Sequence, residues 1–98
     1  MTTSTFLENV TATFHARSDA FARLTDTGGQ DAYRLAHRAA DNAILEALHR
    51  GATPAAVSAA AGIPEERLPK ALRRMASAGS KLAIELVRRL YPITSVAA

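Results

Sequence analysis

Apolar residues recur every three or four positions along most of this chain, and that spacing predicts amphipathic helices. No stretch alternates apolar and polar residues in the way that marks a half-buried strand. Glycine and proline interrupt the periodic stretches and divide them into about five segments. The pattern therefore predicts an all-α fold with about five helices.

The first helix is predicted over residues 5–24, where the apolar positions form a seam of the heptad type with Arg17 at one step. Such a seam packs either within its own domain or against a second copy of the chain, and the pattern leaves both alternatives open. If it joins two copies, its contact residues are Leu7, Val10, Phe14 and Phe21.

The second helix is predicted over residues 32–50, after a loop that contains Gly28 and Gly29. Asp31 is placed to cap this helix, and Gly51 ends it. Leu45 falls toward the polar side of the helix. The apolar face consists of Tyr33, Ala36, Ala40, Ile44, Ala47 and Leu48.

Residues 53–63 have the chemistry of a capped helix followed by a turn. Thr53 is placed to cap the helix, and Pro54 occupies its first position, where a missing N–H does no harm. Ser58 is a small residue suited to a close helix crossing. Gly62 allows the positive φ of the turn, and Ile63 fills the apolar space beneath it.

A third helix follows, with its predicted apolar face at Leu68, Leu72 and Met75. Pro69 is the difficulty, because proline inside a helix removes a hydrogen bond and costs about 3 kcal/mol. Two solutions are open: a helix that begins near Leu68 after an extended turn, or a helix that bends at Pro69.

The stretch 53–74 resembles the helix-turn-helix of small, alanine- and arginine-rich bacterial DNA-binding proteins, and the resemblance covers about a fifth of the chain. It implies that the second helix of the motif enters the major groove of double-stranded DNA. Pro64, Glu65 and Glu66 depart from the usual motif at the start of that helix. The DNA contacts that the resemblance implies are Thr53, Glu66, Arg67, Lys70, Arg73 and Arg74.

The last helix is predicted over residues 80–91, between Gly79 and Pro92, with Ser80 as its cap. Its apolar surface is too wide for burial on one side only, which favours an interface with a second subunit. The residues expected there are Leu82, Leu86 and Leu90, and residues 93–98 are expected to form a loose tail.

Charge is unevenly distributed between the two halves of the 98-residue chain. Residues 1–50 carry five arginines and six acidic residues, whereas residues 51–98 carry seven lysines and arginines and three acidic residues. A basic half that holds the candidate motif is consistent with a polyanionic partner and equally with a solvated helix surface, and the charge alone leaves both alternatives open. With no cysteine, signal peptide or membrane span in sight, we expect a cytoplasmic location, or a nucleoid-associated one if the protein binds DNA.

Catalytic and metal-binding motifs are absent from the sequence, so we expect neither an enzyme nor a bound cofactor. His15 with Asp19 and His37 with Asp41 are spaced four apart, which is more typical of surface hydrogen bonds than of metal sites.

Together these patterns predict a single helical domain, residues 1–98, with helices on both sides of a central helix-turn-helix core at residues 31–76. Residues 5–24 and 80–91 are the candidate dimerisation segments. The predicted function is a dimeric, DNA-binding transcriptional regulator. The alternative is a protein-interaction module that binds a partner regulator through the same scaffold, which the prolines and glutamates near the motif's second helix favour. Neither the target sequence nor an effector ligand follows from the residues.

Overall fold

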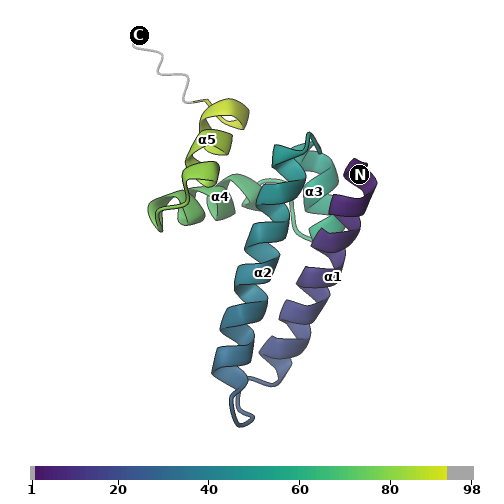
Figure 1. The fold of residues 1–98 in the computed structure, drawn as a ribbon, viewed down its shortest axis with the longest axis vertical. Coiled ribbons are helices and arrows are strands. Elements are labelled where there is room, and N and C mark those ends of the chain that lie inside the picture. Colours follow the sequence, from purple (N-terminus) through teal and green to yellow (C-terminus); the bar gives the residue numbers. More distant parts are fainter. Residues whose placement is uncertain (1, 93–98) are drawn as a thin grey trace.

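The computed structural model describes residues 2–92 and contains five helices, which confirms the predicted all-α fold (Figure 1). The predicted tail at residues 93–98 lies outside the described residues. In chain order the helices are α1 (Thr3–Ala22), α2 (Gly29–His49), α3 (Pro54–Ala61), α4 (Arg67–Ser77) and α5 (Lys81–Leu90).

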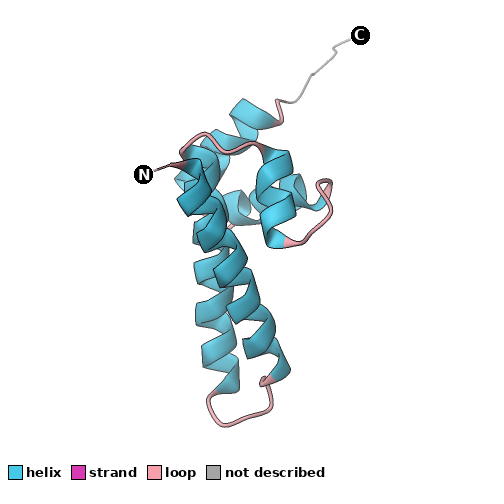
Figure 2. Ribbon diagram, turned by 90° about the vertical axis from the view of Figure 1, so that its right-hand side faces the viewer, coloured by secondary structure: helices cyan, strands magenta, loops and turns pink. Residues whose placement is uncertain are grey.

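Helices α1 and α2 form a long antiparallel hairpin, and the three shorter helices gather around one end of it (Figures 1 and 2). The loop that joins α1 to α2 lies at the other end, well away from α3, α4 and α5. We call the end with the three short helices the body, and the part of α1 and α2 that leads to the loop the arm.

Close packing at the tip of the arm explains the second of its two glycines. Gly28 has a φ of 74°, in the left-handed region that glycine adopts without strain. Gly29 is buried and begins α2, and a Cβ at this position would collide with the carbonyl oxygens of Arg23 and Leu24. The early start of α2 places Asp31 inside its first turn, so the prediction of Asp31 as a cap is wrong. Its carboxylate instead lies 3.3 Å from Arg34.

The hydrophobic core lies in the body, where α1, α3 and α5 all pack against α2. Because α2 is covered from several directions there, Leu45 is buried with only 8% of its surface exposed, and its predicted place on the polar side is wrong. The largest fully buried side chains are Val10, Ile44, Leu48, Val57, Leu68, Leu72 and Leu86.

The capping and turn chemistry of α3 agrees with the prediction. The Thr53 hydroxyl accepts a hydrogen bond from the Ala56 N–H at 3.1 Å, which satisfies one free donor at the start of the helix. Gly62 adopts a φ of 70°, and the Ile63 N–H donates to the Ser58 carbonyl at 3.1 Å. Ser58 is 2% exposed, as expected at a close helix crossing.

Pro69 is accommodated by the position at which α4 begins. The helix starts at Arg67, so Pro69 is its third residue and belongs to the first turn, where backbone N–H groups have no partner within the helix. Residues 64–66 form the turn before it, with the Arg67 N–H donating to the Pro64 carbonyl at 3.0 Å. The structure therefore adopts the first of the two solutions, and α4 is not broken.

Three of the predicted dimer contacts belong to the core of a single chain. Val10 and Leu86 have no exposed surface and Phe14 has 8%, so these residues are not available to a second copy, and the interface prediction is wrong for them. Helices α1 and α5 use these side chains to pack into the core of the body. The other predicted contacts keep exposed surface: Leu7, Leu82 and Leu90 are half-buried, and Phe21 is 61% exposed. Within residues 2–92, no helix has the length and apolar character that crossing a bilayer demands.

Candidate nucleic-acid interface

Helix α4 has one face in the core and one in solvent. Leu68, Leu72 and Met75 are buried, as predicted. The opposite face carries Lys70 and Arg73, with Glu66 immediately before the helix, and all three are exposed. Within residues 2–92, Lys70 and Arg73 take part in no ion pair, so their charges remain available to a partner.

Arg74 is held by a residue of α2. Its two terminal nitrogens donate to the two carboxylate oxygens of Asp41 at 3.0 and 2.9 Å, a bidentate pair. The hydrogen bond to Asp41 raises the pKa of Arg74 above its ordinary value. His37 also approaches Asp41, with 3.5 Å between Nδ1 and Oδ2. Arg74 therefore joins α4 to α2, and its charge is largely neutralised where a phosphate contact was expected.

Two of the basic residues predicted to contact DNA lie on the same side of α4 as Arg74. Arg67 and Lys70 line a pocket of about 240 Å³ together with Arg74, and Arg17 of α1 completes its basic side chains. Sequence reasoning did not assign Arg17 to any site. The available signal was its position in the α1 seam, where an apolar residue was expected and a cation stands. The Arg17 guanidinium lies 4.4 Å from the ring centre of Phe14, a cation–π contact.

Arg73 lies on the other flank of α4, toward the end of α5. It influences the Tyr91 hydroxyl: burial raises the pKa of Tyr91, the negative charge of Glu65 raises it further, and Arg73 lowers it. The Tyr91 hydroxyl is buried and has no hydrogen-bond partner among the described residues. The predicted DNA contacts thus divide between two flanks of the same helix.

Thr53 is exposed at the start of α3, and none of the pockets that include α4 residues includes it. Its hydroxyl already caps α3, so any contact of this residue with a phosphate would use the backbone N–H groups beside it. Thr53 and Glu66 therefore lie outside the pocket that Arg67, Lys70 and Arg74 share.

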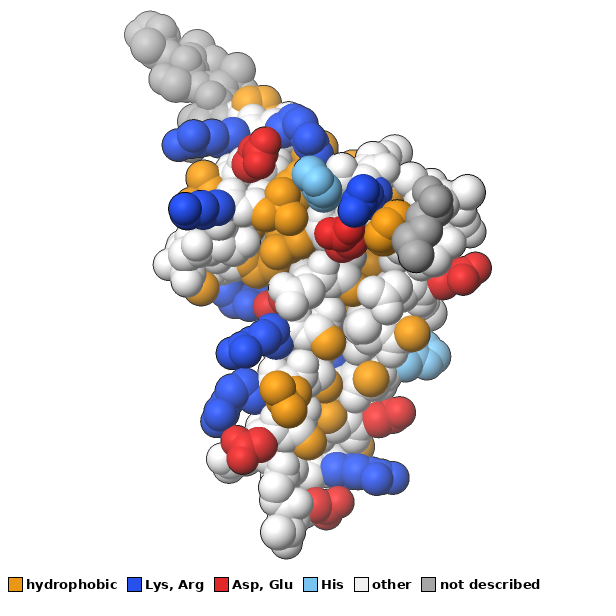
Figure 3. Space-filling model, in the orientation of Figure 1, with side chains coloured by type: hydrophobic (Ala, Val, Ile, Leu, Met, Phe, Trp, Pro, Cys, Tyr) orange, Lys and Arg blue, Asp and Glu red, His pale blue; other side chains and the backbone are white. Residues whose placement is uncertain are grey.

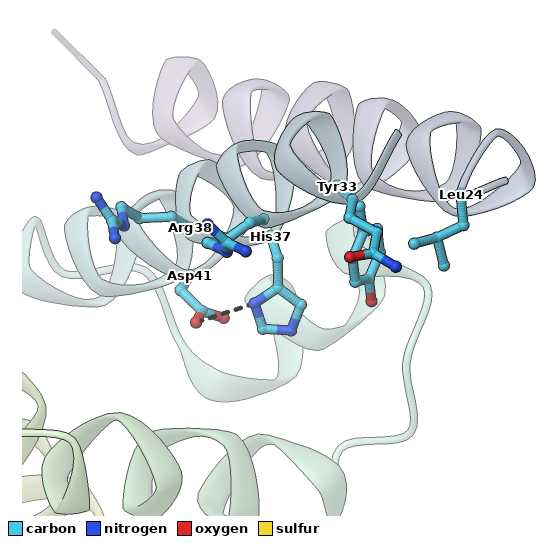
Figure 4. Close-up of a pocket in the computed structure, with 7 residues that line it drawn as sticks. Leu24, Tyr33, His37, Arg38 and Asp41 are labelled. Atoms are coloured by element: carbon cyan, nitrogen blue, oxygen red, sulfur yellow. Dashed lines mark ion pairs between the residues drawn. The ribbon is translucent and has the colours of Figure 1, made fainter. Parts of the chain in front are cut away.

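The arm continues the basic surface away from α4. Figure 4 shows Tyr33, His37 and Asp41 pointing to the same side of α2, where they line an open groove of about 470 Å³ with Leu24 and Arg38. Two of its rings pack edge to face, with 5.8 Å between the ring centres of Tyr33 and His37. In Figure 3, Lys and Arg side chains gather around α5 and along the α2 edge of the arm.

In the described part of the chain, no group of three or more His, Asp or Glu side chains is placed to hold a metal ion. Comparison of the chain with protein-family models, curated proteins and solved structures finds no match.

Proposed function

We propose that this protein is a dimeric DNA-binding regulator of the helix-turn-helix type, in which the exposed face of α4 contacts double-stranded DNA. The observation that carries the proposal is the division of α4 into a buried apolar face and an exposed face on which Lys70 and Arg73 take part in no ion pair within residues 2–92. Pro69, in the first turn, leaves the rest of the helix regular.

The position of each charged side chain along α4 determines whether we expect it to contact a base or a phosphate. Glu66 and Lys70 lie near the N-terminal end, which reads base edges in helix-turn-helix complexes. Glu66 is suited to accept a hydrogen bond from the cytosine N4 amino group. Arg67 and Arg73 lie on the two flanks, where contacts to phosphate are expected. Arg74 acts indirectly, by fixing α4 to α2 through Asp41.

The test is a salt titration of binding to a random duplex and to DNA from upstream of the coding sequence, followed by fluorescence anisotropy. Arg73→Ala, at a phosphate contact, is expected to weaken binding and to reduce the slope of log K against log salt by about 1, whereas Lys70→Ala, at a base contact, is expected to weaken binding by about 1–3 kcal/mol. Arg23→Ala is the matched control, because it removes one exposed positive charge from the loop end of the arm. Absence of binding to either duplex at low salt would falsify the proposal.

The proposed dimer uses the surface of α5. After Ala83 and Leu86 have been buried by the same chain, Leu82 and Leu90 remain half-buried and Ile84 is 37% exposed. A second copy on the Ile84 side of α5 would cover this side chain, and the proposal requires a twofold arrangement with the two α4 helices about 34 Å apart, one turn of DNA. Sedimentation equilibrium should give a dimer mass that Ile84→Glu converts to a monomer mass. A wild-type monomer at high micromolar concentration rules the dimer out.

The second candidate function is a protein-interaction module that binds a partner regulator. It is favoured by the two exposed glutamates, Glu65 and Glu66, at the start of α4, because they repel phosphate, and by the neutralisation of Arg74. If the α5 dimer forms but no DNA binds at low salt, this second function replaces the first.

A further inference from the structure

The pocket beside α4 has an apolar floor. Phe14 of α1 and Ile44 of α2 are buried at its base, and Ile63 and Ala71 are half-buried at its sides. These side chains come from two helices, a turn and the first half of α4. The volume of about 240 Å³ is sufficient for one small ring system.

The rim of the pocket is strongly basic. Asp41, its one acidic residue, already accepts two hydrogen bonds from Arg74. Among residues 2–92, the remaining cations of the rim, Arg17, Arg67 and Lys70, take part in no ion pair. Phe14 supports the Arg17 guanidinium at 4.4 Å, which limits the orientations that this side chain samples. The rim thus offers guanidinium donors whose fork geometry matches a carboxylate.

We infer that this pocket binds a small aromatic carboxylate, with its ring on the floor of Phe14, Ile44 and Ile63 and its carboxylate at Arg17 and Arg67. A flat ring covers the exposed parts of Ile63 and Ala71 above this floor, and its carboxylate offsets one of the three positive charges of the rim that take part in no ion pair among residues 2–92. A phosphate ion lacks the apolar part. The pocket has the features of most small-molecule sites: an apolar cavity and a few polar groups that fix the orientation of the ligand.

Binding of such a ligand has a consequence for DNA. Arg67 and Lys70 belong both to the rim and to the α4 surface that we propose for DNA, so ligand and duplex compete for the same positive charges. This competition rests on the proposed function, whereas the pocket and its ligand class do not. Arg17 lies on α1 and belongs to the pocket alone, and Arg73 belongs to the α4 surface alone.

The test uses 2-naphthoate as the probe and follows backbone amide shifts by NMR as it is added to the full chain. Shifts are expected at Phe14, Ile44 and Ile63. Arg17→Ala should weaken binding at least about tenfold, the loss of one charge-assisted hydrogen bond. Arg73→Ala, the matched control, should bind the probe as the wild type does. The neutral methyl ester of the probe should bind at least about tenfold more weakly.

A second variant, Ala71→Leu, fills the pocket without changing its charge and should also abolish the shifts, with an otherwise wild-type amide spectrum confirming the fold. Equal binding of the probe and its ester, or unchanged binding by both Arg17→Ala and Ala71→Leu, overturns the inference.

DNA titrations with the same variants separate the two proposals. Arg73→Ala should weaken DNA binding and leave probe binding unchanged. Arg17→Ala should weaken probe binding and leave DNA binding unchanged. Probe binding without DNA binding keeps the pocket and rejects the proposed function, and the opposite result rejects the pocket.

Discussion

The two halves of α2 share one apolar face but differ in how much of their surface the neighbouring helices bury. In the body half, Ala40, Ala43, Ile44, Leu45, Ala47 and Leu48 are all buried. In the arm half, only Gly29 is buried, and Leu35 is 65% exposed. Periodicity therefore defines the faces of a helix, whereas the neighbouring elements decide how much of each face is covered. In the arm, α1 is the only neighbour visible in Figures 1 and 2.

The same contrast holds for α1. Val10 and Phe14 are buried at the body end, and Phe21 is 61% exposed near the tip of the arm, although all three belong to one apolar seam. The seam predicted one continuous interface. It serves the core at one end and leaves an aromatic side chain exposed at the other, where Phe21 packs on Tyr33.

The largest difference between body and arm is expected from leucine truncation. Leu72→Ala removes a fully buried side chain and should lower the free energy of unfolding by about 2–5 kcal/mol, through lost burial and the cavity left behind. Leu35→Ala makes the same chemical change on the arm and should alter it by less than about 0.5 kcal/mol. Urea denaturation measures both. Equal losses would mean that the arm is as well covered as the body.

Removing a buried hydroxyl should also affect the body more than the arm, but here the substitution raises the free energy of unfolding. Ser58 Oγ is buried without a hydrogen-bond partner among the described residues, so Ser58→Ala should stabilise the body by about 1 kcal/mol. Ser18→Ala, at an exposed site on α1, should gain only about 0.5 kcal/mol or less from the better helix propensity of alanine. Thermal and urea unfolding of the two variants test this order. A destabilised Ser58→Ala variant would show that the hydroxyl has a partner in solution.

Ion pairs provide a finer comparison. The bidentate Asp41–Arg74 pair connects α2 to α4, and a double-mutant cycle to alanine should give a coupling of about 1 kcal/mol. The Asp31–Arg34 pair near the start of α2 is exposed at both ends, and its coupling should be about 0.3 kcal/mol. Added salt should reduce the second coupling more than the first. Equal couplings would contradict the role of Arg74 in fixing α4.

The smallest expected effect concerns Tyr91 and appears only at alkaline pH. Burial raises the pKa of Tyr91 in the folded chain above its value of about 10 in the unfolded chain. The stabilisation linked to the protonated hydroxyl is therefore complete below about pH 10 and is lost as the pH rises through the folded pKa. Between about pH 9 and pH 11, the wild type should lose more stability than Tyr91→Phe in urea unfolding. Parallel losses would show that Tyr91 titrates alike in both states.

Local chemistry accounts for what the sequence predicted well. Thr53 and Ser80 cap helices three residues from the N–H groups that they accept from, and Gly62 adopts the positive φ of the turn. These interactions lie within one turn of chain, so the residue order alone specifies them. The order of five helices and the buried face of α4 follow for the same reason, since both depend on spacing within a segment.

Residue order was therefore sufficient to predict the five helices, the caps at Thr53 and Ser80, the turn at Gly62 and the apolar face of α4. Contacts between distant segments bind Arg74 to Asp41, bring Arg17 to the rim of the pocket beside α4, and place Val10, Phe14 and Leu86 in the core. The physical reason is separation along the chain. Asp41 and Arg74 lie 33 residues apart, and no local periodicity records which distant charge or apolar face a folded chain brings alongside.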